Sequence, residues 1–103
     1  MRFIRPTNLN ADSFVLDVRS AEEYSRSALG IPHIHKALAE LNPRLFIKEN
    51  GLDGGRTVNI LCASGNRASQ AAEMFEKAGF DNVAVIIGGI VEAEYEGLKI
   101  VRN

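Results

Sequence analysis

Three apolar runs, each followed by a helical pattern, constrain the fold of this 103-residue chain more than any other feature. The runs are Phe14–Val18 (broken only by Asp17), Val58–Leu61 (broken only by Asn59) and Val83–Ile87. Continuous apolar runs are typical of strands buried on both faces, and strands alternating with helices predict a mainly parallel sheet. We therefore expect an α/β fold, with one domain over residues 1–103 and a short edge strand at Phe3–Ile4.

Capping residues predict two helices in the first half of the chain. Ser20 and Glu23 match a capping box, which predicts a helix from Ala21 to about residue 27. Asn42 before Pro43 matches an N-cap followed by proline at the first helical position, and that helix should end near residues 50–51. Between these helices, residues 31–34 are expected to form a short strand.

A third helix, after Val58–Leu61, has the clearest periodicity. Its apolar residues recur at offsets of three and four, and Gly79 is a natural C-cap. The apolar stripe consists of Ala68, Ala71, Ala72, Phe75 and Ala78. Gly88–Gly89 should then turn the last apolar run into a short final helix at about residues 91–95.

Composition and charge exclude several classes of protein. The net charge of −1 gives no electrostatic reason to expect nucleic acid or an anionic membrane as a partner. One cysteine forms neither an internal disulfide nor, by itself, a zinc site, which favours a reducing compartment such as the cytoplasm. The N-terminus lacks the pattern of a signal peptide, and no apolar run is long enough to span a bilayer.

The single cysteine marks the candidate site. Cys62 begins the run Cys-Ala-Ser-Gly-Asn-Arg, between the strand expected at Val58–Leu61 and the helix that follows. At this position we expect backbone N–H groups and the helix dipole to converge on the sulfur and favour the thiolate, which is the nucleophilic form of cysteine. A ring of such amides is also an anion nest. The alternative is that Cys62 is a small buried hydrophobic residue.

The chain resembles the rhodanese-like sulfurtransferases through an ordered set of motifs. These are the Asp17–Arg19 triplet, Glu22–Tyr24, the loop from Cys62 to Arg67, the alanine-rich helix, the junction at 78–83 and Gly88–Ile90. The resemblance implies a five-stranded, mainly parallel sheet with helices on both faces. It also implies an activity, in which the thiolate takes a sulfane sulfur from a donor, becomes a persulfide and passes the sulfur to an acceptor.

The resemblance assigns roles to residues of this loop and its surroundings. Cys62 is the expected nucleophile, and no cofactor or metal is required. The expected anion nest comprises the amides of Ala63, Ser64, Gly65, Asn66, Arg67 and Ala68. The expected partners are a small sulfur donor such as thiosulfate and a thiol or cyanide acceptor, with an acceptor protein as an alternative.

Of four charged residues near the site, the two arginines keep alternative roles at this stage. Arg67 either attracts an anionic donor and stabilises the charged sulfur, or pairs with Asp17 or Glu23 and fixes the loop. Arg19 either adds positive charge for substrate binding or forms a plain surface ion pair. Asp17 and Glu23 are expected to support the site structurally, since a buried carboxylate such as Asp17 needs partners.

His33 and His35 are two residues apart and would face the same side of a strand. We interpret them as polar residues at the rim of the site rather than as metal ligands, because no third ligand is evident.

The resemblance leaves two other functions to be weighed. Dual-specificity phosphatases share the fold, but their loop has one more residue between cysteine and arginine than the four present here, so a sulfur atom suits this loop better. A non-enzymatic binding module or a persulfide relay is the other alternative. Two departures from the family pattern concern the turn at residues 27–34 and a common tryptophan, near whose place Ala93 stands.

Overall fold

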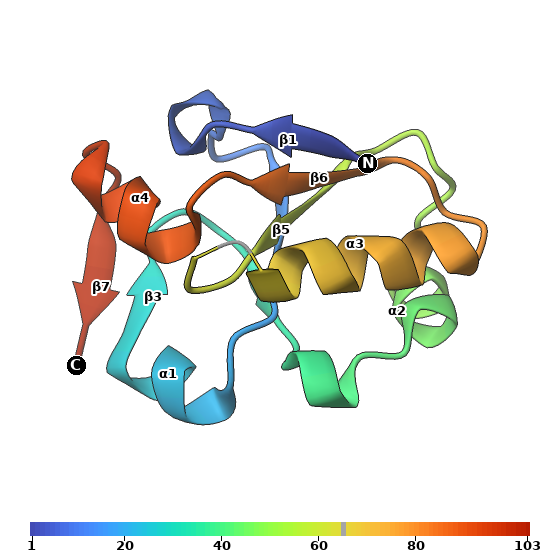
Figure 1. The fold of residues 1–103 in the computed structure, drawn as a ribbon, viewed down its shortest axis with the longest axis horizontal. Helices are drawn as coiled ribbons and strands as arrows, with labels where there is room; N and C mark the ends of the chain where they lie inside the picture. The colour runs from blue at the N-terminus through green and yellow to red at the C-terminus, as the bar shows by residue number, and fades with distance from the viewer. Residues whose placement is uncertain (65) are drawn as a thin grey trace.

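Five strands form a parallel sheet, in agreement with the expected α/β fold (Figure 1). The structure, a computed structural model, describes residues 1–64 and 66–103. In spatial order the strands are β1 (Arg2–Ile4), β6 (Val83–Ile86), β5 (Val58–Leu61), β2 (Phe14–Asp17) and β4 (Ile34–His35). Each pair of neighbouring strands is parallel, so the strands all end at one edge of the sheet.

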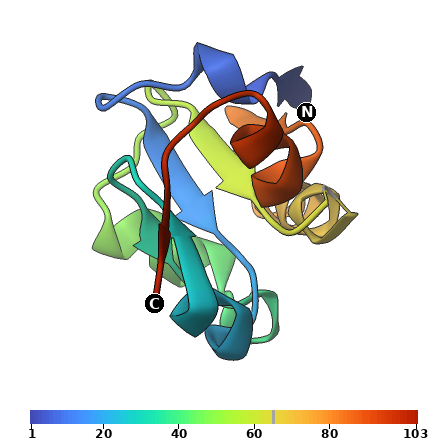
Figure 2. The same ribbon diagram turned by 90° about the vertical axis from the view of Figure 1, so that its left-hand side faces the viewer.

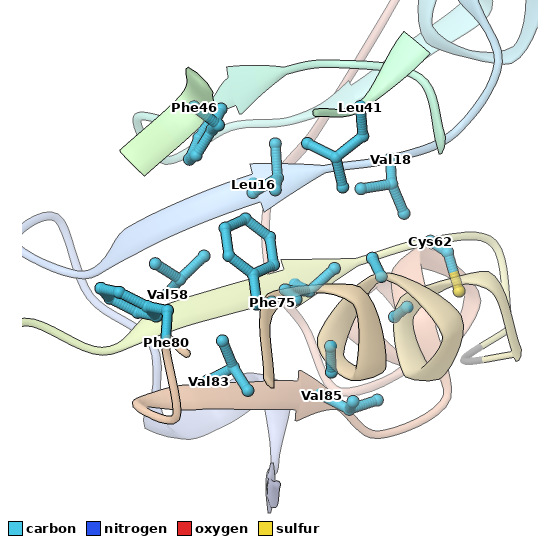
Figure 3. Packing of buried hydrophobic residues seen from close by; sticks show 14 residues of the cluster. Leu16, Val18, Leu41, Phe46, Val58, Cys62, Phe75, Phe80, Val83 and Val85 are labelled. Carbon is cyan, nitrogen blue, oxygen red and sulfur yellow. The ribbon is translucent and has the colours of Figure 1, made fainter. Parts of the chain in front are cut away.

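Helices α2 (Pro43–Glu49) and α3 (Asn66–Lys77) cover the first face of the sheet. Ala68, Ala71, Ala72 and Phe75 of the predicted stripe are fully buried. Phe14, Phe46, Phe75 and Phe80 follow one another through the interior, with neighbouring ring centroids 5.8–6.1 Å apart. Figure 3 shows Phe46, Phe75 and Phe80 among the valines and leucines of this cluster.

The second face is covered by α4 (Gly89–Tyr95), with the 3-10 helix η1 (Pro6–Asn8) beside it. Successive strand residues point to opposite faces, so Leu61 and Ile86 pack here, against Ala93, while Ile60 and Val85 pack on the first face. Helices therefore lie on both faces, as the family resemblance implied. Ala93, which stands near the place of the missing tryptophan, is fully buried.

The expected capping interactions are present. In α1 (Ala21–Arg26) the Ser20 hydroxyl accepts from the Glu23 amide, and the Glu23 carboxylate accepts from the Ser20 amide at 3.0 Å. In α2 the Asn42 side chain accepts from the Leu45 amide at 3.2 Å. Gly79, which follows α3, adopts φ 87°, a value that suits glycine at a helix end. Local sequence thus determines where these helices start or end.

The region between α1 and α2 differs from the expectation. The strand expected at residues 31–34 is β4, Ile34–His35, and the 3-10 helix η2 (Leu38–Glu40) follows it. Two further strands were not predicted, β3 (Ser27–Leu29) and β7 (Ile100–Arg102), which pair antiparallel. Figures 1 and 2 show β7 running beside β3, apart from the main sheet. This pairing joins segments more than seventy residues apart, so no local pattern announces it.

Candidate active site

The residues expected at the site gather at the carboxyl edge of the parallel sheet, where open α/β folds commonly place their ligands. Cys62 follows β5, while Val18 and Arg19 follow β2, the neighbouring strand. The Val18 amide donates to the Leu61 carbonyl at 2.9 Å, so the pairing of the two strands continues to the start of the cysteine loop. Gly88 and Gly89 follow β6 on the other side of β5.

Cys62 is buried, with 1% of its surface exposed. It packs in the first-face cluster together with Val18 and Ala68. Figure 3 shows its sulfur pointing into the bend of the chain between β5 and the first turn of α3. Burial alone fits a hydrophobic residue as well as a nucleophile. The direction of the sulfur, into the loop, is the feature that favours a reactive role, which stays a prediction.

The N-terminal turn of α4 holds the cysteine loop from the second face of the sheet. The Ile90 amide donates to the Cys62 carbonyl at 2.9 Å, and the Val91 amide donates to the Ala63 carbonyl at 3.4 Å. In a trans peptide the N–H of the next residue points opposite to the C=O. The amides of Ala63 and Ser64 therefore point away from α4. An anion nest needs its N–H donors on this side of the loop.

Gly89 makes this close approach possible. A Cβ added to it would lie 2.3 Å from the Cys62 carbonyl oxygen and 2.5 Å from that of Ala63. Its φ of 62° is also in the left-handed region that favours glycine. The sequence motif Gly88–Gly89 signalled a turn, but the contact between α4 and the cysteine loop could not be read from it.

The expected nest residues are placed as follows. Ala63 is half-buried, Ser64 and Asn66 are exposed, Arg67 is half-buried and Ala68 is fully buried, whereas Gly65 lies outside the described residues. Asn66, Arg67 and Ala68 form the first turn of α3, where amides have no carbonyl four residues earlier within the helix. In general, such amides bind capping groups, water or ligands rather than carbonyls of their own helix. The nest itself stays a prediction.

Arg67 forms a bidentate ion pair with Glu23 of α1, at 2.6 and 2.9 Å. The hydrogen bonds to Arg67 lower the pKa of Glu23 to about 2, with the amide and hydroxyl of Ser20 adding to the effect. Hydrogen bonding to Glu23 raises the pKa of Arg67, and attraction to Cys62 and Asp17 contributes in the same direction. The predicted pairing of Arg67 with Glu23 is thus present in the structure, whereas the role of Arg67 toward the sulfur or a donor stays a prediction.

Asp17 and Arg19 form a second, buried pair. The Arg19 guanidinium donates to the Asp17 carboxylate at 2.8–3.2 Å and to the Ser27 carbonyl at 2.8 Å. The interpretation of Arg19 as a surface ion pair was wrong, because β3 and the strand end enclose its side chain. Substrate binding by Arg19 stays a prediction, and Arg67 is the more accessible of the two cations.

The two histidines contact one residue, Tyr24. The Tyr24 ring stacks on His35 with centroids 4.1 Å apart, and its hydroxyl lies 2.7 Å from Nε2 of His33. His33 Nδ1 lies 2.8 Å from the Ile31 carbonyl oxygen, and His35 Nε2 lies 2.8 Å from that of Arg19. Within the described residues no group of three or more His, Cys, Asp or Glu side chains is arranged to hold a metal ion.

A cavity of about 430 Å³ lies elsewhere, at the amino ends of the strands. Arg2, Phe14, Arg56, Asn59 and Ala84 contribute to its lining. Its lining residues include no cysteine or histidine, so we place the candidate site at the carboxyl edge, where the cysteine loop joins β5 to α3. No helix in the described part of the chain is long and apolar enough to cross a membrane.

Comparison with known proteins agrees with this geometry. The model of the rhodanese-like domain family matches residues 6–95. The chain belongs to this family. It is 35% identical over 77 residues to the candidate sulfur carrier protein YrkF of Bacillus subtilis (strain 168), a match that covers 74% of this chain and 38% of that protein. The chain thus spans well under half the length of this curated relative.

Solved structures of rhodanese-like proteins share the fold. A rhodanese-related protein from Thermoplasma volcanium aligns with a TM-score of 0.77 and 29% identity, covering 98% of each chain. The rhodanese-like domain of an Anabaena sp. protein aligns over the whole chain and 80% of that domain, with a TM-score of 0.79 and 20% identity. An NAD-dependent persulfide reductase from A. fulgidus is 28% identical, with a TM-score of 0.68, over 88% of this chain and 16% of that protein.

Proposed function

We propose that this rhodanese-like chain is a sulfurtransferase that carries sulfane sulfur on Cys62 as a persulfide. The observation that supports this most is the direction of the Cys62 sulfur, into a loop whose Cys62 and Ala63 carbonyls are turned outward onto α4. The amides on the inner side of such a loop stabilise negative charge, whether on a thiolate or on a persulfide. Arg67, half-exposed in the first turn of α3, places a positive charge at the end of this loop.

The proposed reaction has two balanced steps. The Cys62 thiolate attacks the outer sulfur of thiosulfate, so a new S–S bond forms, the donor S–S bond breaks and sulfite leaves with the bonding electron pair. Cyanide or a thiolate then attacks the outer sulfur of the persulfide, which releases thiocyanate or a new persulfide and restores the Cys62 thiolate. These steps predict ping-pong kinetics.

The comparisons support sulfur chemistry of this kind without naming the donor or the acceptor. One relative bears the name of a candidate sulfur carrier, and one structural neighbour is called a persulfide reductase. Burial of Cys62 limits the reagents that can reach it. The outer sulfur of a persulfide lies about 2 Å beyond the cysteine sulfur, so it is the atom nearer to an incoming acceptor.

Mass spectrometry of the intact protein tests the proposal. Incubation with thiosulfate or polysulfide should add one sulfur atom, and cyanide should remove it as thiocyanate. Cys62→Ser should abolish both events, while Ser25→Ala, at an exposed position of α1, should retain them. If the wild-type protein gains no sulfur from either donor, or if it hydrolyses an aryl phosphate in a manner that depends on Cys62, the proposal is wrong.

A further inference from the structure

The cavity at the amino ends of the strands, here called the amino-edge cavity, is built on a row of side chains beyond the cover of α4. Ladder pairing places Arg2 of β1 and Asn59 of β5 on either side of Ala84 of β6. Residues two apart along a strand share a face of the sheet. The row therefore lies on the second face, one step before Leu61 and Ile86, which pack beneath α4. The short side chain of Ala84 leaves room between its two longer neighbours.

The size of the amino-edge cavity suits a small molecule rather than a single ion. Its volume of about 430 Å³ falls within the roughly 300–1,000 Å³ of ordinary ligand pockets, whereas one water occupies about 30 Å³. Asp12 and Ser13, from the segment between η1 and β2, add to the lining. Three strands and a loop therefore present side chains to one occupant.

Asn59 presents an amide oxygen that has no donor in the described part of the chain. The residue lies in β5, the central strand, and is 6% exposed. Its Nδ2 donates to the Phe14 carbonyl at 3.1 Å, but no described residue donates to its Oδ1. Buried polar atoms normally have a hydrogen-bond partner. Because Asn59 lines the cavity, an occupant with an N–H or O–H group would supply a donor to this oxygen.

Two arginines line the amino-edge cavity, and both are held by neutral partners. The Arg2 guanidinium donates to the Thr57 hydroxyl at 2.7 Å. The Arg56 guanidinium donates to the Asp12 carbonyl at 2.8 Å and lies over the Phe14 ring, 5.1 Å from its centroid. Guanidinium groups fixed in this way suit the oxygens of a phosphate or a carboxylate.

The charge of these arginines is not balanced by carboxylates of the described chain. Five other arginines form ion pairs with glutamate or aspartate, but neither Arg2 nor Arg56 does. Asp12 brings a carboxylate to the lining, yet it forms no ion pair with either of them in the described structure. With two guanidinium groups and one carboxylate, the lining keeps a net positive charge.

From these observations we infer that the amino-edge cavity binds a small organic anion. Its phosphate or carboxylate contacts Arg2 and Arg56, and another part of the molecule donates a hydrogen bond to Oδ1 of Asn59. A lone inorganic anion fits less well, because it would leave this oxygen and most of the volume unused. The inference goes beyond the proposed function and does not depend on it, since Cys62 lies at the opposite edge of the sheet.

Titration of the protein with four probes tests the inference, followed by two-dimensional amide NMR. Adenosine monophosphate (AMP) carries a phosphate and an amino group, and 4-aminobenzoate carries a carboxylate and an amino group, so these two distinguish the kinds of anion. Adenosine lacks the anion, and inorganic phosphate lacks the organic part. AMP or 4-aminobenzoate should bind about tenfold more tightly than adenosine or inorganic phosphate at low ionic strength, and added salt should weaken this binding.

The side-chain amide signals of Asn59 show whether a probe enters the cavity. They should shift during the titration, whereas those of Asn50 should not. Asn50 is the matched control, because its Nδ2 also donates to a backbone carbonyl, that of Phe46 at 2.9 Å, but it does not line the cavity. Binding without a shift at Asn59 would contradict the inference.

Charge variants test the two arginines. Arg2→Gln and Arg56→Gln should each weaken binding about fivefold, because each removes a charged donor to the anion. Asp12→Asn should strengthen binding about twofold, because it removes a like charge from the lining. Arg44→Gln, at an exposed position of α2, is the control and should have no effect. All the changed side chains are exposed, so the amide spectra should show an intact fold.

The outcomes separate this inference from the proposed function. If neither AMP nor 4-aminobenzoate binds more tightly than inorganic phosphate, or if Arg2→Gln and Arg56→Gln bind like the wild type, the inference is wrong. A protein that binds a probe in the expected manner but never gains sulfur on Cys62 would refute the proposed function alone. Normal sulfur loading without binding of either probe would refute the amino-edge site alone.

Discussion

Two arginine–carboxylate pairs stand near the cysteine loop, and they differ in their access to water. The side chains of Arg19 and Asp17 are 3% and 0% exposed, whereas those of Arg67 and Glu23 are 32% and 31% exposed. Both arginines contact both oxygens of their carboxylates. Similar hydrogen bonds therefore occur in two different dielectric environments.

The difference indicates that the Asp17–Arg19 pair mainly supports the folded structure, whereas the Glu23–Arg67 pair mainly supports the cysteine loop. A buried ion pair contributes little more to stability than two apolar side chains would in its place. Removal of one partner, however, is strongly destabilising, because it leaves the other charge buried without a counter-ion or water. A half-exposed pair is screened and contributes little to stability. Arg67, however, is half-exposed at the start of α3, so its charge is accessible to an anionic donor.

The largest expected effect is on the buried pair. Asp17→Asn should lower the free energy of unfolding by about 3–5 kcal/mol, because it leaves the Arg19 charge buried without a counter-ion. Denaturant titration measures this loss. Asp81→Asn, at an exposed position, is the matched control and should stay within about 0.5 kcal/mol of the wild type. Equal losses in the two variants would show that burial of the first pair has no special consequence.

Gly89 shows the effect of an uncharged contact on the same loop, because it allows α4 to pack closely against the Cys62 and Ala63 carbonyls. Gly89→Ala should combine left-handed strain of roughly 1–2 kcal/mol with overpacking against the Cys62 and Ala63 carbonyls of roughly 1–3 kcal/mol. Gly51→Ala is the matched control, because Gly51 has the same φ of 62° and nothing within 4 Å of the added Cβ. Only Gly89→Ala should also slow sulfur loading of Cys62, as seen by mass spectrometry.

Arg67 should show the opposite balance to Asp17, with a larger effect on activity than on stability. Arg67→Lys keeps the charge but loses the bidentate geometry, and we expect about a tenfold lower kcat/KM for thiosulfate. The free energy of unfolding should change by about 1 kcal/mol or less. Arg44→Lys, on the exposed side of α2, is the control and should change neither quantity. If Arg67→Lys lost as much stability as Asp17→Asn, the expected difference between the two ion pairs would be wrong.

The smallest expected effect is the acid dependence of the half-exposed pair. Glu23 has its pKa lowered from 4.5 to about 2, so its contribution to stability is complete above the unfolded value and disappears as the pH falls toward about 2. Screening at this half-exposed site limits the contribution to about 1 kcal/mol or less.

The variant Glu23→Gln isolates this contribution. It should be less stable than the wild type at neutral pH, and the difference should vanish in acid, whereas Glu49→Gln on α2 should show no such trend. Urea unfolding at a series of pH values measures it. A difference that persists at low pH would mean that packing rather than charge is responsible.

Much of the fold follows from local patterns. The apolar runs that became β2, β5 and β6, the capping box at Ser20 and the alanine stripe of α3 each depend on residues a few positions apart. Such spacing is visible in one sequence because strands repeat every two residues and helices every 3.6. The strands β3 and β7 were missed because each is short and pairs only with the other.

The amino-acid sequence by itself determined the α/β order, the position of Cys62 after a strand and the loop of four residues that separates it from Arg67. Tertiary structure alone decided that Arg67 meets Glu23, 44 positions away, that Arg19 is buried and that the amides of α4 turn the loop carbonyls outward. The physical reason is range: periodicity and capping act within one or two turns, whereas ion pairing and backbone contacts at the site depend on how the sheet brings distant segments together.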